Sequence, residues 1–438
     1  MKIALVKRRY SLRRGGSERY CVNLARRLTA LGHDVAVIGE AIDVDLADEV
    51  NFIPVAVNRL TSWTANRSFA ENSGRAARAG KFDVVYGLGR AFGLDAVRVT
   101  ERLQPHWVRV KYRPAWWSRI QRWNPRHRTL IELERRIYNS DSVRRIVTQS
   151  QLDRRLVREY YGVPDEKIRT IHNGVDLSTF HPGVRQHRDD VRKWWRIPLR
   201  APLLLFASMD FAGKGLGAIL RAMSRLQNSD ARLLVLGSGP IPRFERIAEK
   251  LGIHKRVHFA GRQNRIERCY GAADLFLLPT AYEPFPNVNL EAMACGTPVV
   301  TTTSSGCADV IRDGETGYFV SGVDAADEIT DRIERHLHLP PAEAAAMSSR
   351  CWETAKKLPI ERNVEQTLAV FKEVLIEKGT GPFFGPSSTS LPEVLDPKDG
   401  PVPVTTDGDR SIFRSDVDEE SDDKAEKRTS PPGRERAA

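Results

Sequence analysis

Short apolar segments alternate with helix-like segments along most of this chain, and this alternation limits the folds that it can adopt. In the first forty residues, an apolar run at 3–6 precedes a turn with Gly15 and Gly16, a helical pattern at 18–28 and a second apolar run at 34–38. A strand, a helix and a strand in this order form the unit of a parallel, doubly wound sheet. The missing G-x-G-x-x-G motif argues against a dinucleotide dehydrogenase.

A second series of strand-like runs begins near residue 200 and again alternates with helical segments. Its members lie at 203–207, 232–236, 257–259, 273–279 and 298–301. We therefore predict two Rossmann-like domains, at residues 1–178 and 179–356, and a helix at 357–378 that packs back on the first domain. Residues 379–438 hold little apolar content to offset the entropy of ordering, so we expect a disordered tail there.

The charge of the chain is unevenly distributed. The whole chain carries +12, but residues 380–438 hold 8 Lys and Arg against 13 Asp and Glu, which leaves +17 on residues 1–379. A surface this basic favours an anionic partner, such as nucleic acid, phospholipid headgroups or a phosphorylated glycan.

The five cysteines show neither paired nor metal-ligand spacing, so we expect buried free thiols in a reducing compartment. The first apolar run is too short for a signal peptide, and no stretch approaches the roughly 18 apolar residues of a membrane span. These features favour a cytoplasmic protein.

Two glutamates eight positions apart, Glu283 and Glu291, are the strongest functional signal. The first precedes a turn rich in Pro and Asn, and the second follows residues compatible with a helix. A helix that begins near Asn287 would present free backbone N–H groups to the turn, an arrangement that favours phosphate. Two carboxylate acceptors beside an anion site suit a nucleotide-activated sugar.

This E-x7-E element resembles the signature of retaining glycosyltransferases of family 4, which have the GT-B fold. Within that family, the chain is most similar to the lipopolysaccharide core glucosyltransferases. They share the Gly-Gly turn, a Gly93-Leu94-Asp95 stretch, an F-x-x-K-G-like element and a long basic-aromatic segment. The resemblance covers residues 1–378 and implies an α/β fold of two Rossmann-like domains facing a cleft.

The resemblance also implies roles for the residues of this element. Glu283 would contact and orient the donor sugar, and Glu291 would hold the ribose hydroxyls. Four consecutive residues would line the diphosphate: Phe285, Pro286, Asn287 and Val288. Pro286 has no N–H to donate, so one possible phosphate contact is absent.

Other donor-site residues follow from the same resemblance. Gly15 and Gly16 would approach the donor phosphate or sugar, because glycine permits close backbone contact. Lys214 would stabilise the charge on the departing diphosphate. Relatives commonly place an Arg where this chain has Met209. Arg262 follows a strand at the position where relatives bind the nucleotide base.

The N-terminal domain should supply a residue near the reacting carbon. The matching position among the core transferases is acidic and falls on Glu101, with His106 as the nearby alternative. The implied reaction is a front-face displacement, in which Glu283 orients the sugar and is not a nucleophile. Double displacement would need a second carboxylate beside the anomeric carbon, and Glu291 is assigned to the ribose. We expect neither a metal ion nor another cofactor.

Residues 98–136 form a basic-aromatic segment, with eleven Lys and Arg against three acids and half of the eight tryptophans. Tryptophan beside arginine is typical of an interfacial membrane anchor, although a solvated basic face is an alternative. The predicted contacts are Trp107, Arg109, Lys111, Trp116, Trp117, Arg119, Arg122 and Trp123. No nucleic-acid-binding module is recognised here, and no nucleic acid is expected as a partner.

We conclude from the sequence that the chain is a retaining glycosyltransferase, peripheral on the inner face of the cytoplasmic membrane. It would move a sugar, with a UDP-sugar as the expected donor, to a membrane-linked saccharide such as the lipopolysaccharide core. The alternative from another class is a non-catalytic GT-B protein that binds nucleotide and docks on membrane. A sugar-nucleotide epimerase with the GT-B fold is a third possible function, but that reaction has no obvious need for the basic-aromatic segment.

Overall fold

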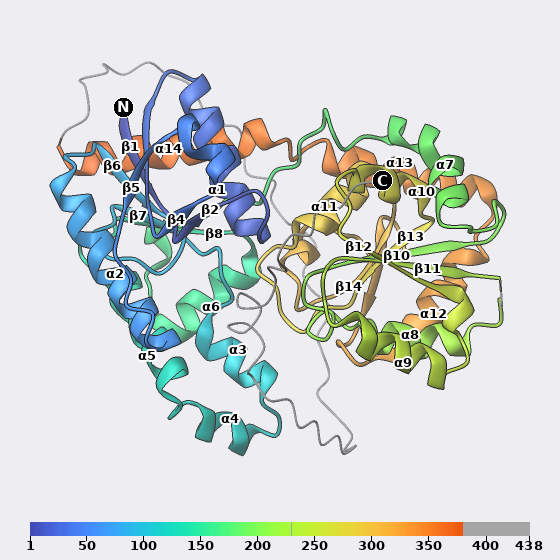
Figure 1. Cartoon of the computed structure of the whole chain (residues 1–438). Helices are drawn as coiled ribbons and strands as arrows, with labels where there is room; N and C mark the ends of the chain where they lie inside the picture. Colours follow the sequence, from blue (N-terminus) through green and yellow to red (C-terminus); the bar gives the residue numbers. More distant parts are fainter. Residues whose placement is uncertain (229, 380–438) are drawn as a thin grey trace, which may run out of the picture. The chain divides into compact units, whose positions relative to one another are not determined.

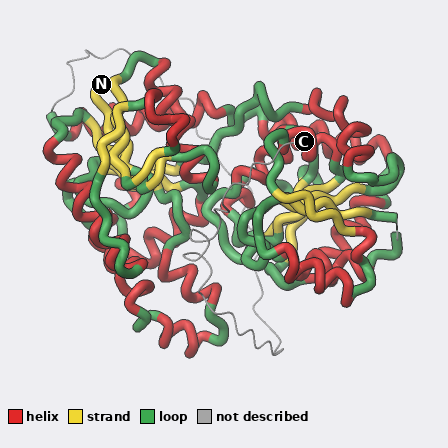
Figure 2. The backbone as a smooth tube through the Cα atoms, in the orientation of Figure 1, coloured by secondary structure: helices red, strands yellow, loops and turns green. Residues whose placement is uncertain are grey.

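Two parallel β-sheets, each flanked by helices, make up the part of the chain that the computed structural model describes, residues 1–228 and 230–379 (Figures 1 and 2). This confirms the predicted pair of Rossmann-like domains. The first sheet uses residues 2–170 and the second uses residues 203–320. The predicted tail lies outside the described residues except for Gly379.

The N-terminal sheet has seven parallel strands in the order β5-β3-β1-β6-β7-β8-β9. The strands are β1 (Lys2–Val6), β3 (Asp34–Gly39), β5 (Asn51–Pro54), β6 (Val84–Gly87), β7 (Ala96–Arg98), β8 (Arg145–Thr148) and β9 (Ile168–Thr170). A separate pair joins β2 (Arg9–Tyr10) to β4 (Ala41–Ile42). In register, Leu5 lies between Val37 and Tyr86. Because helices cover both faces, the central strands are continuous apolar runs and not alternating ones.

Six helices belong to this half: α1 (Gly16–Ala30), α2 (Ser62–Ala79), α3 (Gln104–Lys111), α4 (Ala115–Gln121), α5 (Pro125–Tyr138) and α6 (Gln151–Tyr161). The apolar residues of α1 recur at helical spacing, and Tyr20, Leu24 and Leu28 are buried against the sheet. The basic-aromatic segment thus forms a strand end followed by α3, α4 and α5.

The C-terminal sheet has six parallel strands in the order β12-β11-β10-β13-β14-β15. They are β10 (Leu203–Ala207), β11 (Arg232–Leu236), β12 (Val257–Gly261), β13 (Leu275–Leu278), β14 (Val299–Thr302) and β15 (Gly317–Val320). The helices are α7 (Arg188–Trp194), α8 (Leu216–Arg225), α9 (Ile241–Lys250), α10 (Ile266–Ala272), α11 (Asn287–Ala294), α12 (Ala326–Leu337) and α13 (Pro341–Ala355). Leu205 lies between Leu234 and Phe276 and is fully buried.

The last helix, α14 (Ile360–Glu377), packs on the N-terminal half although it follows the C-terminal sheet in sequence (Figure 1). Phe371 contacts Tyr86 edge to face, with ring centroids 5.0 Å apart. The Tyr20 hydroxyl donates a buried hydrogen bond of 3.0 Å to Asn363. This helix therefore completes the apolar core on one side of the first sheet.

Each sheet reverses its strand order once, and ligands of such sheets bind beyond the carboxyl ends of the strands at that point. In the N-terminal sheet the reversal lies between β1 and β6, and in the C-terminal sheet it lies between β10 and β13. The Gly15-Gly16 turn follows β1 and β2. Lys214 follows β10, and Glu283 follows β13. The topology therefore brings the predicted residues to ligand-binding ends of both sheets.

The five cysteines, Cys21, Cys269, Cys295, Cys307 and Cys351, are buried and unpaired, as the sequence predicts. Burial raises the pKa of Cys21 to about 12, which keeps it a thiol at neutral pH. Among the described residues, no group of three or more His, Cys, Asp or Glu side chains gathers closely enough to hold a metal ion.

Candidate active site

A cavity of about 620 Å³, here called the donor cavity, is lined by residues from both halves of the chain. It contains every residue expected to bind the donor or its diphosphate: Gly15, Gly16, Lys214, Arg262, Glu283, Phe285, Pro286, Asn287, Val288 and Glu291. Pockets of a few hundred cubic ångströms with a few placed polar groups are typical of small-molecule sites.

Glu283 lies between two cations in the lining of this cavity. One carboxylate oxygen, Oε2, accepts hydrogen bonds from the Lys214 ammonium group and from Arg102, at 3.2 Å from Nε and 3.1 Å from Nη2. Burial would raise the pKa of Glu283, but Lys214 and Arg102 together lower it, so the side chain is a carboxylate at neutral pH. Burial lowers the pKa of Lys214, and the Glu283 charge opposes that effect.

Arg102 is one functional candidate that the sequence did not single out. Its guanidinium group stacks on Trp107, 4.2 Å from the ring centroid, and also contacts Asp210 Oδ2 at 3.4 Å. Arg90 donates to the Arg102 carbonyl at 3.1 Å and so holds the loop that carries it. Arg102 thereby supplies a cation from the N-terminal half. In the C-terminal half, Met209 lines the cavity at the position where relatives commonly place an Arg.

Two helix N-termini meet at the donor cavity. Gly15 caps α1 and Pro286 caps α11, in each case without a side-chain hydrogen bond. A Cβ atom added at Gly16 would lie 3.7 Å from Asn287 Nδ2, so the two helix ends are close neighbours. Free N–H groups and the positive ends of two helix dipoles thus face the same space, which favours a diphosphate.

Asn173 fixes this junction between the halves. Its Nδ2 donates to Asn287 Oδ1 at 2.6 Å and to the Phe285 carbonyl at 3.2 Å. Its Oδ1 accepts from Arg98 Nη2 at 2.8 Å. The N-terminal half therefore positions the first turn of α11 through one amide side chain.

Arg98 lines the donor cavity and does not belong to the exposed face of the basic-aromatic segment. It is 1% exposed and stacks on Tyr20, 4.7 Å from the ring centroid. Its Nε and Nη1 atoms have no hydrogen-bond partner among the described residues. A buried guanidinium group with free donors is costly unless a ligand oxygen satisfies it. Arg98 was hidden in the sequence because it ends a strand of only three residues.

Glu291 lies on α11, and its side chain accepts a 3.0 Å hydrogen bond from the Tyr270 hydroxyl. Burial raises its pKa, and the nearby charge of Arg19 acts in the opposite direction. Tyr270 was not anticipated from the sequence. It holds one oxygen, Oε2, while Glu291 remains in the lining of the cavity.

The two residues considered for a role near the reacting carbon do not line the donor cavity. Glu101 is paired with Arg90, whose charge lowers its pKa against the opposing effect of burial. His106 packs edge to face against Tyr282, with ring centroids 4.7 Å apart, and burial lowers its pKa to about 4. The residue that follows Glu101, Arg102, is the N-terminal side chain that contacts Glu283.

The two halves of the chain match two family descriptions. Residues 14–179 match "Glycosyltransferase Family 4", and residues 187–358 match "Glycosyl transferases group 1". The chain is a family 4 glycosyltransferase with the GT-B fold. The transferase is 29% identical over 375 residues to a probable transglycosylase of Burkholderia thailandensis, covering 84% of this chain and 96% of that protein.

Another relative matches a smaller part of this chain. A D-inositol 3-phosphate glycosyltransferase of Mycolicibacterium paratuberculosis is 32% identical over 246 residues, and the match spans about half of each protein, 54%. Among solved structures, WaaG, described as a glycosyltransferase involved in lipopolysaccharide biosynthesis, has a TM-score of 0.74 at 23% identity, over 84% of this chain and 99% of that one. Anabaena HepE with UDP and glucose has a TM-score of 0.66 at 17% identity, over 84% and 98%. At these identities, the likeness shows the fold.

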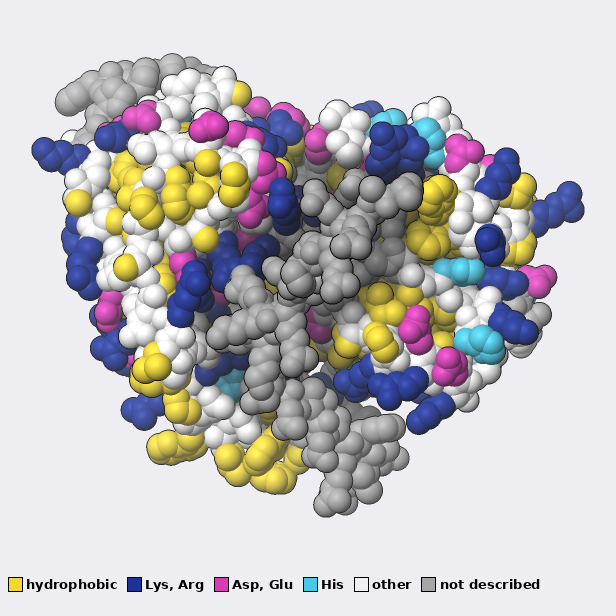
Figure 3. Space-filling model, in the orientation of Figure 1, with side chains coloured by type: hydrophobic (Ala, Val, Ile, Leu, Met, Phe, Trp, Pro, Cys, Tyr) yellow, Lys and Arg dark blue, Asp and Glu magenta, His cyan; other side chains and the backbone are white. Residues whose placement is uncertain are grey.

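The surface of the transferase around α4 is apolar and basic. Trp116, Trp117 and Trp123 are 59%, 39% and 79% exposed. Figure 3 shows hydrophobic side chains gathered at the lower end of the face, where α4 lies in Figure 1. Arg119 and Arg122 are exposed beside them.

The other predicted membrane contacts lie on α3. Arg109 and Lys111 are exposed. Trp107, in contrast, is partly buried and stacks with Arg102. Within the described residues, none of the helices is long and apolar enough to cross a bilayer.

Proposed function

We propose that the transferase moves a sugar from a UDP-sugar, with retention of configuration, to a membrane-linked saccharide such as the lipopolysaccharide core. The observation that carries this proposal is the Glu283 carboxylate, held between Lys214 and Arg102 where the N-termini of α1 and α11 meet. A nucleoside diphosphate and a hydroxylated ring both find complementary groups there.

In the proposed reaction, the bond between the anomeric carbon and the diphosphate oxygen breaks as the acceptor hydroxyl forms a new bond on the same face. The acceptor proton passes to the departing phosphate oxygen, so that a nucleoside diphosphate and a glycoside leave. Lys214, Arg102 and the helix N-termini would stabilise the charge that develops on the leaving group. Glu283, already neutralised by two cations, would orient the sugar hydroxyls.

UDP-sugar as the donor is supported by the solved relatives. HepE has the same fold and was crystallised with UDP and glucose and with UDP-glucose. Arg262, which lines the donor cavity, donates to the Arg13 carbonyl at 2.9 Å and would lie beside the nucleotide. We propose that Glu291 holds the ribose with its remaining acceptor capacity.

A membrane-linked acceptor is supported by the α4 surface. Exposed tryptophans next to arginines suit the headgroup region of an anionic bilayer, where rings are partly desolvated and guanidinium groups meet phosphate. WaaG, which shares the fold, is described as involved in lipopolysaccharide biosynthesis. We propose that the transferase works on the inner face of the cytoplasmic membrane.

The test is transfer of radiolabelled sugar from UDP-glucose, UDP-galactose or UDP-N-acetylglucosamine to lipopolysaccharide core or lipid extracts. We expect one donor to support transfer, and Glu283→Gln to reduce it by about 10²-fold or more, the range for a lost transition-state contact. NMR of the product would show the anomeric configuration of the new glycosidic bond. Retention requires that this configuration be the same as in the donor. Nucleotide binding without hydrolysis or transfer from any donor would favour the non-catalytic alternative.

A further inference from the structure

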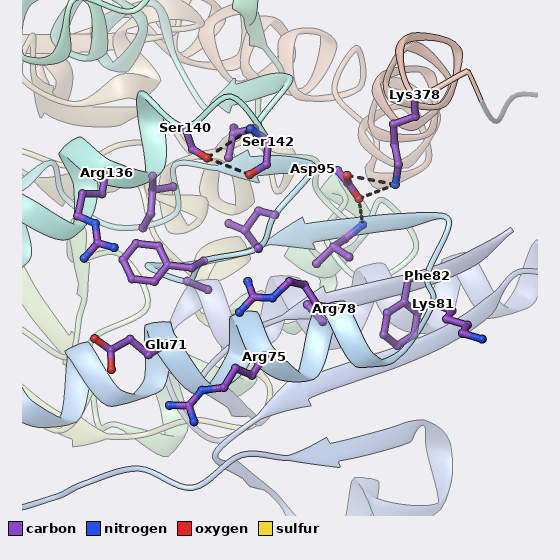
Figure 4. Close-up of a pocket in the computed structure, with 18 residues that line it drawn as sticks. Glu71, Arg75, Arg78, Lys81, Phe82, Asp95, Arg136, Ser140, Ser142 and Lys378 are labelled. Carbon is purple, nitrogen blue, oxygen red and sulfur yellow. Dashed lines mark hydrogen bonds and ion pairs between the residues drawn. The ribbon is translucent and has the colours of Figure 1, made fainter.

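A second cavity, of about 790 Å³, lies in the N-terminal half and is here called the N-terminal cavity (Figure 4). It is bordered by α2, by the end of α5 with the loop that follows it, and by the connection between β6 and β7, and it opens to solvent, where Arg78 and Arg136 are exposed. It shares no lining residue with the donor cavity. A ligand bound here would therefore be separate from the nucleotide-sugar.

The wall of the N-terminal cavity has an excess of free positive charge. Arg78 on α2 and Arg136 on α5 have no carboxylate within ion-pair distance among the described residues. The acids of the same wall are already engaged, because Glu71 pairs with Arg67 at 3.0 Å and Asp95 pairs with the Lys378 ammonium group at 3.1 Å. The two arginines thus lack a counter-charge.

Both guanidinium groups belong to the lining of the N-terminal cavity. In Figure 4, Arg78 extends from α2, and Arg136 extends from the end of α5 on another side of the cavity. Arg136 stacks on Phe92, 4.5 Å from its ring centroid, which fixes the orientation of its planar group. Ser140 and Ser142, whose hydroxyl oxygens lie 2.9 Å apart, line the cavity above them.

The loop that carries Phe92 is packed tightly against α2. A Cβ atom added at Gly74 would lie 3.1 Å from the Phe92 backbone, and Gly93 adopts a φ of +68°. Glycine at both positions therefore allows a close approach that holds the aromatic wall in place. The floor beneath is apolar, with Leu94 and Ile137 buried.

We propose that the N-terminal cavity binds a phosphate-bearing ligand that also has an apolar or carbon-rich part. The phosphate would lie between Arg78 and Arg136, whose forked N–H donors match its oxygens, and near the serine hydroxyls. The apolar floor and the Phe92 ring would contact the remainder of the ligand. The volume suits a molecule of sugar-phosphate or lipid-headgroup size.

This chemistry is shared by a soluble sugar phosphate and by the headgroup of an anionic phospholipid. Two measurements separate these sources. Isothermal titration with glycerol 3-phosphate and with inorganic phosphate tests the soluble form. Sedimentation with phosphatidylcholine vesicles, with and without phosphatidic acid, tests the lipid form.

We expect one of the two probes to bind the wild-type chain and to bind Arg78→Gln/Arg136→Gln at least about tenfold more weakly. The matched control is Arg155→Gln/Arg200→Gln, which removes two exposed guanidinium groups outside both cavities. It should bind as the wild type does. Arg78→Lys/Arg136→Lys, which keeps the charge and loses the fork, should bind with intermediate affinity.

A further control separates this cavity from the donor cavity, which also attracts phosphate. Lys214→Gln should leave binding at the N-terminal cavity unchanged, whether or not the chain proves to use a UDP-sugar. The proposal is overturned if neither probe binds, if binding depends on Lys214 alone, or if the Arg155→Gln/Arg200→Gln pair weakens it equally. Circular dichroism of each variant shows that a loss of binding is not a loss of fold.

Discussion

Arg102 and Glu283 join the two halves of the transferase through two hydrogen bonds to a single carboxylate oxygen, at 3.2 and 3.1 Å. They are 181 positions apart in sequence. Lys214 contacts the same oxygen. The residue expected to orient the donor sugar is therefore controlled by one cation from each half, and the relative placement of the halves enters the geometry of the site.

The first prediction concerns Arg102. Arg102→Met removes one of the two cations on Glu283, a charge that in the proposed reaction lies beside the departing diphosphate, so kcat/KM should fall by about 10²-fold. Arg102→Lys should reduce kcat/KM less, because the positive charge remains and only the forked hydrogen-bonding geometry of the guanidinium group is lost. Steady-state kinetics with the donor that supports transfer in the proposed assay measures both variants.

Trp107→Leu serves as the control for Arg102, because it removes the stacking partner and keeps the cation. Its effect on kcat/KM should be smaller than that of Arg102→Met. Equal turnover in the wild type and Arg102→Met would show that Arg102 only braces the two halves.

The second prediction concerns the helix end at Gly16. The fold can accept valine at this position, because its Cβ atom would lie 3.7 Å from Asn287 Nδ2, an ordinary contact distance. The valine side chain would, however, fill space that the proposed diphosphate needs. We expect Gly16→Val to raise the KM for the donor about tenfold, equivalent to about 1.4 kcal/mol. Thermal unfolding should change little.

Gly217→Val is the matched control for this change. Gly217 lies in the first turn of α8, and a Cβ atom there would also meet its nearest neighbour, an Arg221 nitrogen, at 3.7 Å. Because Gly217 itself does not line the donor cavity, KM should stay unchanged. A rise in KM with both variants would indicate a general effect of valine at a helix start.

Much of this site could be predicted because its signals are local. Glu283 and Glu291 stand at a fixed spacing on one turn and helix, and Lys214 and Gly16 each follow a strong apolar strand. The ends of such strands at a switch point are where ligands bind. Motif and strand together place these side chains without knowledge of distant contacts.

The remaining features depend on contacts that a pattern does not reveal. Arg102 is one of eleven basic residues in its segment, and only the packing of two distant loops selects it. Strands β7 and β9 have three residues each, too few for a periodicity signal. Trp107 and Trp116 both lie in the basic-aromatic segment, and tertiary packing leaves the first partly buried and the second exposed.

The third prediction is a pH dependence of stability at Asp153. Burial raises its pKa to about 7, and the Tyr282 hydroxyl donates to its Oδ1 at 2.9 Å. An unfolded Asp has a pKa of about 3.9, so between these values the folded chain binds more protons than the unfolded chain. Its contribution to stability therefore falls as the pH rises from about 4 to about 7 and is constant above that.

Asp153→Asn removes this titration and keeps an acceptor for Tyr282. Relative to the wild type, the variant should gain stability from pH 5 to pH 8, by up to about 3 kcal/mol, since about two pKa units at 1.36 kcal/mol each lie in that window. Denaturant unfolding at the two pH values measures the difference. Parallel pH profiles for the two proteins would contradict the prediction.

The fourth prediction concerns metal ions. Because Lys214, Arg102 and two helix N-termini can supply the positive charge at the diphosphate, we expect turnover in EDTA to equal turnover in buffer with Mg²⁺. The same assay on Lys214→Gln is informative, since that variant should lose activity in both buffers. A wild-type enzyme that is inactive in EDTA and restored by a divalent cation would show that these groups are insufficient.

The last prediction concerns the α4 surface. Trp116→Ser/Trp117→Ser/Trp123→Ser removes three exposed rings, and burial of a large side chain is worth about 1.5–3 kcal/mol when complete. Even partial insertion would then make binding to anionic vesicles more than about tenfold weaker, as measured by sedimentation. Added salt should weaken the remaining binding, because salt screens the charge of the arginines beside these rings.

Trp194→Ser, which removes a 78% exposed ring from α7 in the other half, should leave binding unchanged. If both variants bind vesicles as the wild type does, α4 is a solvated basic face and the acceptor reaches the enzyme by another surface.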